Sequence, residues 1–203
     1  VFPTFKGFGL SQEELAQLPG LRQPKDRDIA DAKKLMAEAG YASGFDLTVL
    51  SRTNIQTKNA ATFLTAQLST LGIRAKVDIL EDALFWDRGR TANFHALTYT
   101  PVDTMPDPHW MTRYFLQGSP LVFSGLNDAK IKDLSEKQVR EPDVAKRKQM
   151  LRELERYILT EAMDSLPIVW PFTFIAASPK MKGFSPAISD YVLNRLESVW
   201  LAE

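Results

Sequence analysis

The chain has 203 residues, of which 44% are hydrophobic and 25% are charged, a mixture typical of a globular domain. Basic and acidic residues are equal in number, 25 of each, so the basic excess of a nucleic-acid-binding protein is missing and we expect no nucleic-acid partner. The absence of cysteine excludes disulfide bonds and zinc–thiolate sites. No run of the sequence approaches the roughly 18 apolar residues that a membrane-spanning helix needs.

Residues 1–25 predict a connecting strap. Pro3, Pro19 and Pro24 interrupt regular structure, and the pattern leaves room for a short helix only over 11–18, where Ser11 and Glu14 have the spacing of a capping box. The chain begins without Met, and its start lacks the pattern of a signal peptide. We therefore expect a fragment of a longer protein, from which any targeting segment has been removed.

From residue 26 onward, helical and strand patterns alternate. A helix with apolar residues at helical spacing is predicted from an N-cap at Asp28 to a closing glycine at Gly40. Strands are predicted at 45–50, 73–80 and 94–100, and helices at 55–71 and 82–90. This order indicates an α/β layer with helices packed on a sheet. The residues expected to face inward are Ile29, Ala32, Leu35, Met36, Ala39, Phe63, Leu64, Leu68, Leu71, Ile73, Ala75, Val77 and Ile79.

The second half of the chain is mainly helical. Helices are predicted at 108–117, 127–138 and 143–161, and one or two strands are predicted between 165 and 177. The helix at 143–161 places Met150, Leu151, Leu154, Ile158 and Leu159 inward. Its other face is predicted to be a solvated, ion-paired surface and not a polyanion site. The residues of that face are Lys146, Arg147, Lys148, Arg152, Glu153, Glu155 and Arg156.

A polar segment, residues 100–110, follows directly on the strand at 94–100. Ligands of α/β sheets bind beyond the carboxyl ends of strands, so we expect this loop to face a ligand, with Tyr99 beside it. Asp103 or Asp107 could hold a cationic amine by charge-assisted hydrogen bonds. Metal ligation by both aspartates with His109, or turn and helix-cap roles alone, are the alternatives, and we predict no metal.

Two further loops, residues 51–54 and 80–82, leave strands at the same predicted edge. Arg52 could bind a carboxylate in bidentate fashion, or lie exposed at a helix start, and Asn54 stands beside it. Aromatic residues could line an apolar surface next to these loops, or belong to the core. They are Trp86, Trp110, Trp170, Phe172 and Phe174.

The sequence has no phosphate-binding glycine loop and no G-x-S-x-G nucleophile motif. His95 lies in a predicted strand, where it is expected to point off one face of the sheet and not to serve as a base. We therefore predict a binding module without catalytic residues or cofactors. A hydrolase that uses Asp103, Asp107 and His109 is the enzymatic alternative.

Several ordered motifs resemble the C-terminal half of the family 5 extracellular solute-binding proteins, the peptide/nickel-binding class. Residues 28–41 contain AEAGY after a helical AK.LM pattern, and residues 44–48 read GFDLT. Further along, the similar segments are AQLSTLGI at 66–73, Asp103 with PDP at 106–108, the helix from Asn127 to Leu134, Arg147 through LPI at 166–168, and KGF at 182–184. The order of these motifs agrees with the family from about residue 19 to residue 184.

This resemblance implies two α/β lobes that close on a ligand by a hinge motion and deliver it to an ABC permease. The chain is expected to be the C-terminal lobe of a type II periplasmic-binding-protein-like fold, a mixed sheet flanked by helices. Residues 1–25 would connect it to a missing N-terminal lobe, 26–183 would form the lobe, and 184–203 would return toward the other lobe, with a strand at 197–201. The implied location is periplasmic.

The expected ligand is a small molecule or an oligopeptide, held by Arg52, Asn54, Tyr99, Asp103, Asp107 and Trp110. Peptide binders of the family often carry an amine-binding aspartate where this chain has Thr104, and a tryptophan where it has Pro101. Those departures favour a ligand other than a peptide. The alternative function is a solute-sensing domain of a transcriptional regulator, which an upstream helix-turn-helix would indicate.

Overall fold

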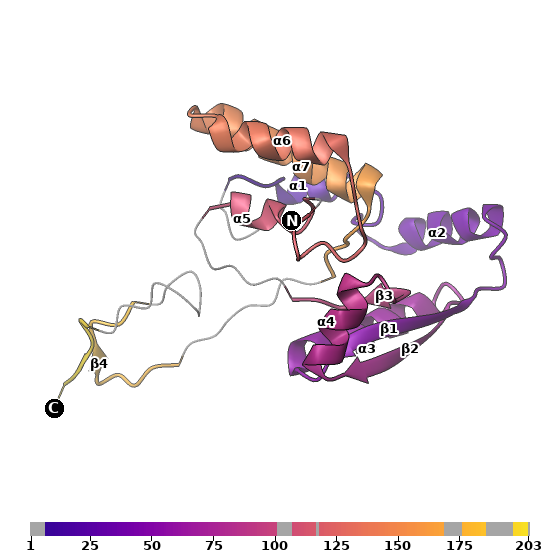
Figure 1. The fold of residues 1–203 in the computed structure, drawn as a ribbon, viewed down its shortest axis with the longest axis horizontal. Coiled ribbons are helices and arrows are strands. Elements are labelled where there is room, and N and C mark those ends of the chain that lie inside the picture. Colours follow the sequence, from indigo (N-terminus) through magenta and orange to yellow (C-terminus); the bar gives the residue numbers. More distant parts are fainter. Residues whose placement is uncertain (1–6, 101–106, 117, 169–175, 186–196, 203) are drawn as a thin grey trace.

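The computed structural model describes residues 7–100, 107–116, 118–168, 176–185 and 197–202, and its central element is a three-stranded sheet (Figure 1). The strand order is β2-β1-β3, with β1 at Asp46–Arg52, β2 at Arg74–Leu80 and β3 at Ala96–Leu97. All three strands run parallel, and the β1–β2 register extends from Asp46 opposite Arg74 to Arg52 opposite Leu80. The carboxyl ends of β1 and β2 therefore lie side by side.

Helices cover both faces of this sheet. The crossover helix α3 (Ile55–Ser69) joins β1 to β2, and α4 (Asp82–Arg90) joins β2 to β3. Leu50 and Leu80 point toward α4 and form a small core with its Phe85. Thr98 lies on the opposite face, where its hydroxyl donates to the Thr57 carbonyl of α3 at 3.2 Å. The α/β class expected from the sequence is confirmed.

The inward stripe of α3 differs from the predicted one. Thr57 and Ala61, four residues apart, are buried, whereas Phe63 is exposed. Small side chains at these positions let the helix approach the sheet closely, so its buried stripe is turned away from Phe63. Ile79 on the edge strand β2 is also exposed, although its alternating pattern had placed it inward.

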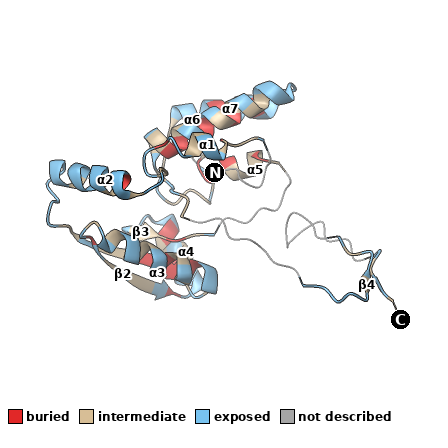
Figure 2. Cartoon of the chain, turned by 180° about the vertical axis from the view of Figure 1, so that it is seen from behind, coloured by how far each residue is buried: buried red, intermediate tan, exposed pale blue. Residues whose placement is uncertain are grey.

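Helix α2 (Asp26–Glu38) begins earlier than predicted. Its N-cap position is Lys25, and Asp28 lies inside the first turn, where its carboxylate accepts hydrogen bonds from the backbone N–H and the guanidinium of Arg22. Asp28 is thus bound to the strap that precedes the helix. Most of α2 is exposed, including the predicted inward residue Leu35 (Figure 2).

The backbone conformation at Gly44 explains why the GF motif begins with glycine. Gly44 has a positive φ of 75°, and a Cβ atom there would lie 1.9 Å from the carbonyl oxygen of Gly72. The loops that enter β1 and β2 therefore touch through their backbones, which a side chain at residue 44 would prevent. Glycine at this position allows the two parallel strands to start in register.

A second, larger core lies among helices of the N-terminal strap and the second half of the chain (Figures 1 and 2). The helices are α1 (Gln12–Leu15), α5 (His109–Thr112), α6 (Ala129–Arg140) and α7 (Val144–Tyr157), and α7 continues as a π-helical turn, η1 (Ile158–Ala162). Asp128 and Asp143 cap α6 and α7 by accepting backbone N–H groups. The predicted inward residues of α7 are buried or half-buried; the fully enclosed members of this core include Ile131, Leu151, Leu154 and Ile158.

The N-terminal strap is held on α7 by acidic side chains. Glu155 was predicted on the exposed face of α7, but it is only 2% exposed and accepts the backbone N–H of Leu10 at 2.6 Å. Glu14, which forms the predicted capping box with Ser11, also pairs with Arg152 and Arg156. The prediction for Glu155 was wrong because the strap covers this part of the helix, which periodicity within α7 cannot reveal.

Two short strands near the C-terminus, β4 (Met181–Lys182) and β5 (Trp200–Leu201), pair antiparallel and lie apart from the sheet in Figure 1. Strand β5 falls within the predicted strand at 197–201. Trp200 and Leu201 are both exposed. The strands predicted between 165 and 177 fall largely on residues 169–175, which lie outside the described residues.

Glu155→Ala should destabilise the protein because it leaves the buried Leu10 N–H without this acceptor. We expect a loss of about 1–3 kcal/mol in the free energy of unfolding, measured by urea denaturation, with faster amide exchange in residues 10–18. Glu153→Ala is the matched control, since Glu153 is exposed on the same helix and pairs only at the surface with Lys130; a change within about 0.5 kcal/mol is expected there. Equal effects of the two substitutions would contradict this role of Glu155.

Candidate ligand-binding site

Arg52 and Asp82 meet at the carboxyl edge of the sheet. Arg52 is the last residue of β1, and Asp82 is the first residue of α4, two positions after β2 ends. The Arg52 Nε and Nη2 atoms donate to the two Asp82 carboxylate oxygens at 2.8 and 2.5 Å. The guanidinium also lies 5.2 Å from the centre of the Trp86 ring, in a cation–π contact. Arg52 thus binds a carboxylate of the protein itself in bidentate fashion, that of Asp82. Its contact with a ligand carboxylate stays a prediction.

Tyr99 occupies the centre of an aromatic cluster next to this pair. Its ring centroid lies 5.6 Å from Trp86, 5.6 Å from Phe123 and 5.8 Å from Tyr114. Burial, with the neighbouring Tyr114, raises the pKa of Tyr99 well above its ordinary value, so its hydroxyl is neutral at physiological pH. The cluster joins the sheet to the helical core, because Trp86 packs on the former and Tyr114 belongs to the latter.

Asn54 has a structural role at the start of α3. Its side-chain oxygen accepts the backbone N–H of Thr57 at 3.0 Å and the Thr57 hydroxyl at 3.1 Å, which makes it the N-cap of the helix. This cap fixes the direction in which the chain leaves β1. It therefore sets the backbone position of the neighbouring Arg52.

Asp107 belongs to a hydrogen-bonded network that joins α5, α6 and α7. Both of its carboxylate oxygens accept from the Arg147 guanidinium, at 2.9 and 2.6 Å, and one also accepts the backbone N–H of His109. Arg147 donates in addition to the Gln138 carbonyl oxygen at 2.9 Å. These bonds hold the pKa of Asp107 below its ordinary value, with the Arg147 contact as the main cause.

The same network fixes the protonation state of His109. Because the Gln138 oxygen accepts from Arg147, its amide nitrogen faces the His109 Nδ1 atom, 3.0 Å away, as a donor. Nδ1 must therefore accept, which assigns the proton of the neutral ring to Nε2. Burial, together with Arg147 and Arg113, holds the pKa of His109 below its ordinary value of 6.5 despite Asp107. These contacts of Asp107 and His109 give no support to the hydrolase alternative.

The predicted site residues thus divide into two groups. Arg52 and Tyr99 come together around Trp86, whereas Asp107 lies in the network of α5 to α7. Trp110 lies on α5, with the Arg113 guanidinium 4.3 Å from its ring centre. Asp103 lies outside the described residues, as do Trp170, Phe172 and Phe174. Phe123 was missed because it stands in a loop without periodicity, and only its packing against Tyr99 and Trp86 reveals it.

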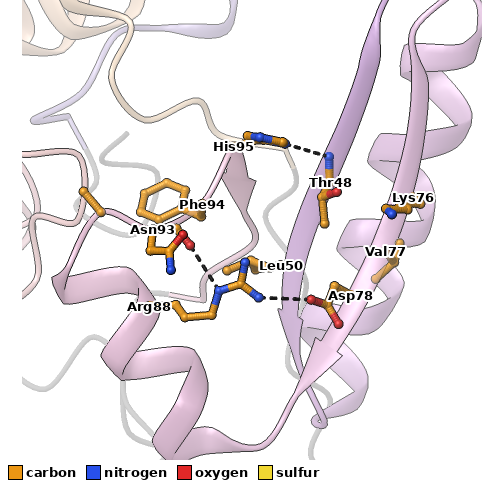
Figure 3. Close-up of a pocket in the computed structure, with 10 residues that line it drawn as sticks. Thr48, Leu50, Lys76, Val77, Asp78, Arg88, Asn93, Phe94 and His95 are labelled. Atoms are coloured by element: carbon orange, nitrogen blue, oxygen red, sulfur yellow. Dashed lines mark hydrogen bonds and ion pairs between the residues drawn. The ribbon is translucent and has the colours of Figure 1, made fainter.

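A hollow of about 600 Å³ lies elsewhere on the sheet, on the face that carries α4 (Figure 3). Arg88 crosses it, donating to Asp78 at 3.1 Å and to the Asn93 carbonyl. His95, expected to point off the sheet, accepts the backbone N–H of Thr48 through Nδ1 at 3.3 Å, at the start of β3. The lining includes Thr48 and Lys76 but none of the predicted site residues, so this hollow is separate from the Arg52 edge.

Within the described parts of the chain, no helix combines the length and apolarity needed to cross a membrane. Nor do three or more His, Asp or Glu side chains gather there in an arrangement that could hold a metal ion.

Known structures with a similar fold are periplasmic binding proteins. AgaA from A. tumefaciens R10, in complex with agropinic acid, is 26% identical over 64% of this chain, with a TM-score of 0.55. DppA from Helicobacter pylori, in complex with the peptide STSA, is 22% identical over 99%, with a TM-score of 0.73. A dipeptide-binding protein from Pseudoalteromonas sp. SM9913, in complex with Met-Leu, is 21% identical over 85%, with a TM-score of 0.67.

The α/β fold of this chain is the one found in these periplasmic binding proteins. The family model for bacterial extracellular solute-binding proteins, family 5 Middle, matches residues 6–121. The chain belongs to this family, as its motifs predicted. It covers only 28%, 38% and 35% of the three similar structures, respectively. No curated protein gave a sequence match.

Protonation of His109 should destabilise the fold. The folded-state pKa lies below the ordinary 6.5, so the stability that neutral His109 contributes is complete above pH 6.5 and is lost as the pH falls through the lower folded value. We expect the free energy of unfolding to decrease in this range. His109→Asn, which keeps an acceptor near Nδ1 but cannot titrate, should flatten the decrease. An unchanged slope in His109→Asn would assign the acid sensitivity to other groups.

Proposed function

We propose that this chain forms one lobe of an extracytoplasmic solute-binding protein that delivers its ligand to an ABC importer. Membership in family 5 supports the class of protein, and the α/β fold supports the assignment of a lobe. The ligand would lie against the carboxyl edge of the sheet, where Arg52, Trp86 and Tyr99 meet.

The strand order is the observation that carries this location. The chain passes from β1 to β2 on one side, and then returns across β1 to place β3 on its other side. The two crossover helices consequently lie on opposite faces of the sheet. In open α/β sheets, ligands bind outside the carboxyl ends of strands at such a reversal of order. Arg52 ends β1, and Tyr99 follows two residues after β3, so both residues border the reversal.

The ligand class that this edge fits best is a small carboxylic acid. A guanidinium presents a planar set of N–H donors that matches the two oxygens of a carboxylate. The Arg52 guanidinium is held at the edge of the sheet by its contact with the Trp86 ring. Agropinic acid and the peptides STSA and Met-Leu, bound by the similar proteins, all carry a carboxylate. This common feature supports an acid without requiring a peptide.

The remaining predicted residues keep a place in the proposal. Asn54 would position Arg52 through the cap of α3, and Asp107 would position α5, and with it Trp110, through Arg147. Asp103 remains a proposed ligand contact in the loop between β3 and α5. The contact surface for the ligand would be completed by the opposite lobe.

The rest of the protein would supply the second lobe. Residues 1–25 would connect to it, residues 26–183 would form the present lobe, and residues 184–203 would return to it. The exposed Trp200 and Leu201 on β5 support this last point, because an apolar strand at the end of the chain suits a surface covered by another part of the protein. The lobes would close on the ligand, and the periplasm is the proposed location.

The test is ligand binding by the full-length protein. Native mass spectrometry would identify a co-purifying solute, and calorimetry would measure binding of agropinic acid, Ser-Thr-Ser-Ala and Met-Leu, with the carboxyl-terminal amides of the two peptides as controls that lack the carboxylate. Arg52→Ala should weaken binding of an acid about tenfold or more, because a charge-assisted hydrogen-bond pair is lost. Arg74→Ala is the matched control, since Arg74 pairs with Asp46 at the opposite end of the same strands.

Two results would count against this proposal. A full-length protein that binds no solute in either assay would contradict the transport function. An equal loss of affinity in Arg52→Ala and Arg74→Ala would contradict the location at the carboxyl edge, because both variants would then act through the stability of the sheet.

A further inference from the structure

We infer that Asp82 is a built-in competitor for the ligand's carboxylate: it occupies Arg52 in the empty protein and is displaced when an acidic ligand binds. This inference rests on the proposed function and assigns Asp82 the role of an internal carboxylate that lowers the affinity for acidic ligands. A neutral ligand would leave the Arg52–Asp82 pair intact and would gain nothing from the guanidinium. An acidic ligand would instead replace Asp82 as the acceptor of the hydrogen bonds from the Arg52 guanidinium.

The geometry of the pair supports this exchange. Asp82 binds Arg52 through two parallel N–H···O contacts, the arrangement that a ligand carboxylate would form with the same guanidinium. Asp82 thereby keeps the Arg52 guanidinium in an orientation suited to ligand binding while no ligand is present. The Trp86 ring, 5.2 Å from the guanidinium carbon, supports Arg52 from a different element than β1, so its position does not depend on Asp82 alone.

Asp82 is free to move into solvent. Its side chain is 53% exposed, whereas that of Arg52 is only 25% exposed. Asp82 is the first residue of α4, but the helix has no side-chain cap bond, and among the described residues Asp82 accepts hydrogen bonds from Arg52 only. A carboxylate in the first turn is also favoured by the helix dipole whether or not it contacts Arg52. Rotation of Asp82 away from Arg52 therefore breaks no further hydrogen bond or ion pair among the described residues.

Three other Asp–Arg pairs of the described residues lack this combination. Asp28 and Asp107 each accept a backbone N–H in addition to a guanidinium, so their release would also free a donor of the fold. Asp46 pairs with Arg74 at the amino edge of the sheet, away from the proposed ligand. Asp82 thus has both features: its contact with Arg52 can be exchanged, and it lies at the carboxyl edge of the sheet.

The Arg52–Asp82 ion pair is weak enough for a ligand carboxylate to replace it. Ion pairs with solvent-exposed members are weak, so Asp82 should reduce the apparent affinity for an acid by only about two- to fivefold. The hydrogen bond from Arg52 holds the pKa of Asp82 below its ordinary value, which keeps the competitor ionised at neutral pH. Asp82 should therefore lower the affinity for acids by this modest factor and leave the affinity for ligands without a carboxylate unchanged.

The experiment compares Asp82→Asn and Asp46→Asn in the full-length protein. Calorimetry with agropinic acid, Ser-Thr-Ser-Ala and Met-Leu should give a dissociation constant about two- to fivefold lower in Asp82→Asn than in the wild type, for each compound that binds. Binding of the two peptide amides should be unchanged, and Asp46→Asn should change neither. In the absence of ligand, modification of Arg52 by phenylglyoxal, located by mass spectrometry, should be faster in Asp82→Asn.

Weaker binding of the acids by Asp82→Asn would overturn the inference, because Asp82 would then position Arg52 instead of competing for it. Unchanged affinity together with an unchanged modification rate at Arg52 would overturn it too. If none of the three acids binds while native mass spectrometry finds a neutral solute, the competition by Asp82 is refuted and the solute-binding function stands. Absence of any bound solute would instead refute the function on which the inference rests.

Discussion

The aromatic cluster around Tyr99 is the contact on which the arrangement of this chain depends. The described residues form two apolar cores, one between the sheet and α4 and one among the helices and the strap. Tyr99 contacts Trp86 on the first and Tyr114 in the second, and Phe123 lies against both Tyr99 and Trp86. Large aromatic rings bury much apolar area in specific geometries, so this contact can set the position of one core on the other.

The cluster also links the fold to the proposed site. Trp86 packs on the small core and also contacts the Arg52 guanidinium. Gly89, one turn further along α4, leaves room for Phe123, because a Cβ atom there would lie 3.1 Å from the Phe123 ring. The same packing that joins the two cores therefore holds a cationic group at the carboxyl edge of the sheet.

Arginine–aspartate pairs have different roles according to their surroundings. Arg147 and Asp107 are tied to Gln138 and to the backbone of His109, so they form part of the connection between α5, α6 and α7. Arg52 and Asp82 are tied to each other and to one aromatic ring at the edge of the sheet. Sequence spacing alone does not distinguish these cases, because the partners lie 30 and 40 residues apart.

The sequence by itself determined the class of fold, the family and most elements, since periodicity and capping act over a few residues. The range predicted for α4 agrees with the structure, and the cap of α1 uses the expected Ser11. Only the tertiary structure decided which faces are covered: it buried Glu155 under the strap, exposed Phe63, and placed Arg52 on Asp82 and Trp86. Those outcomes depend on contacts between distant segments, which no local pattern encodes.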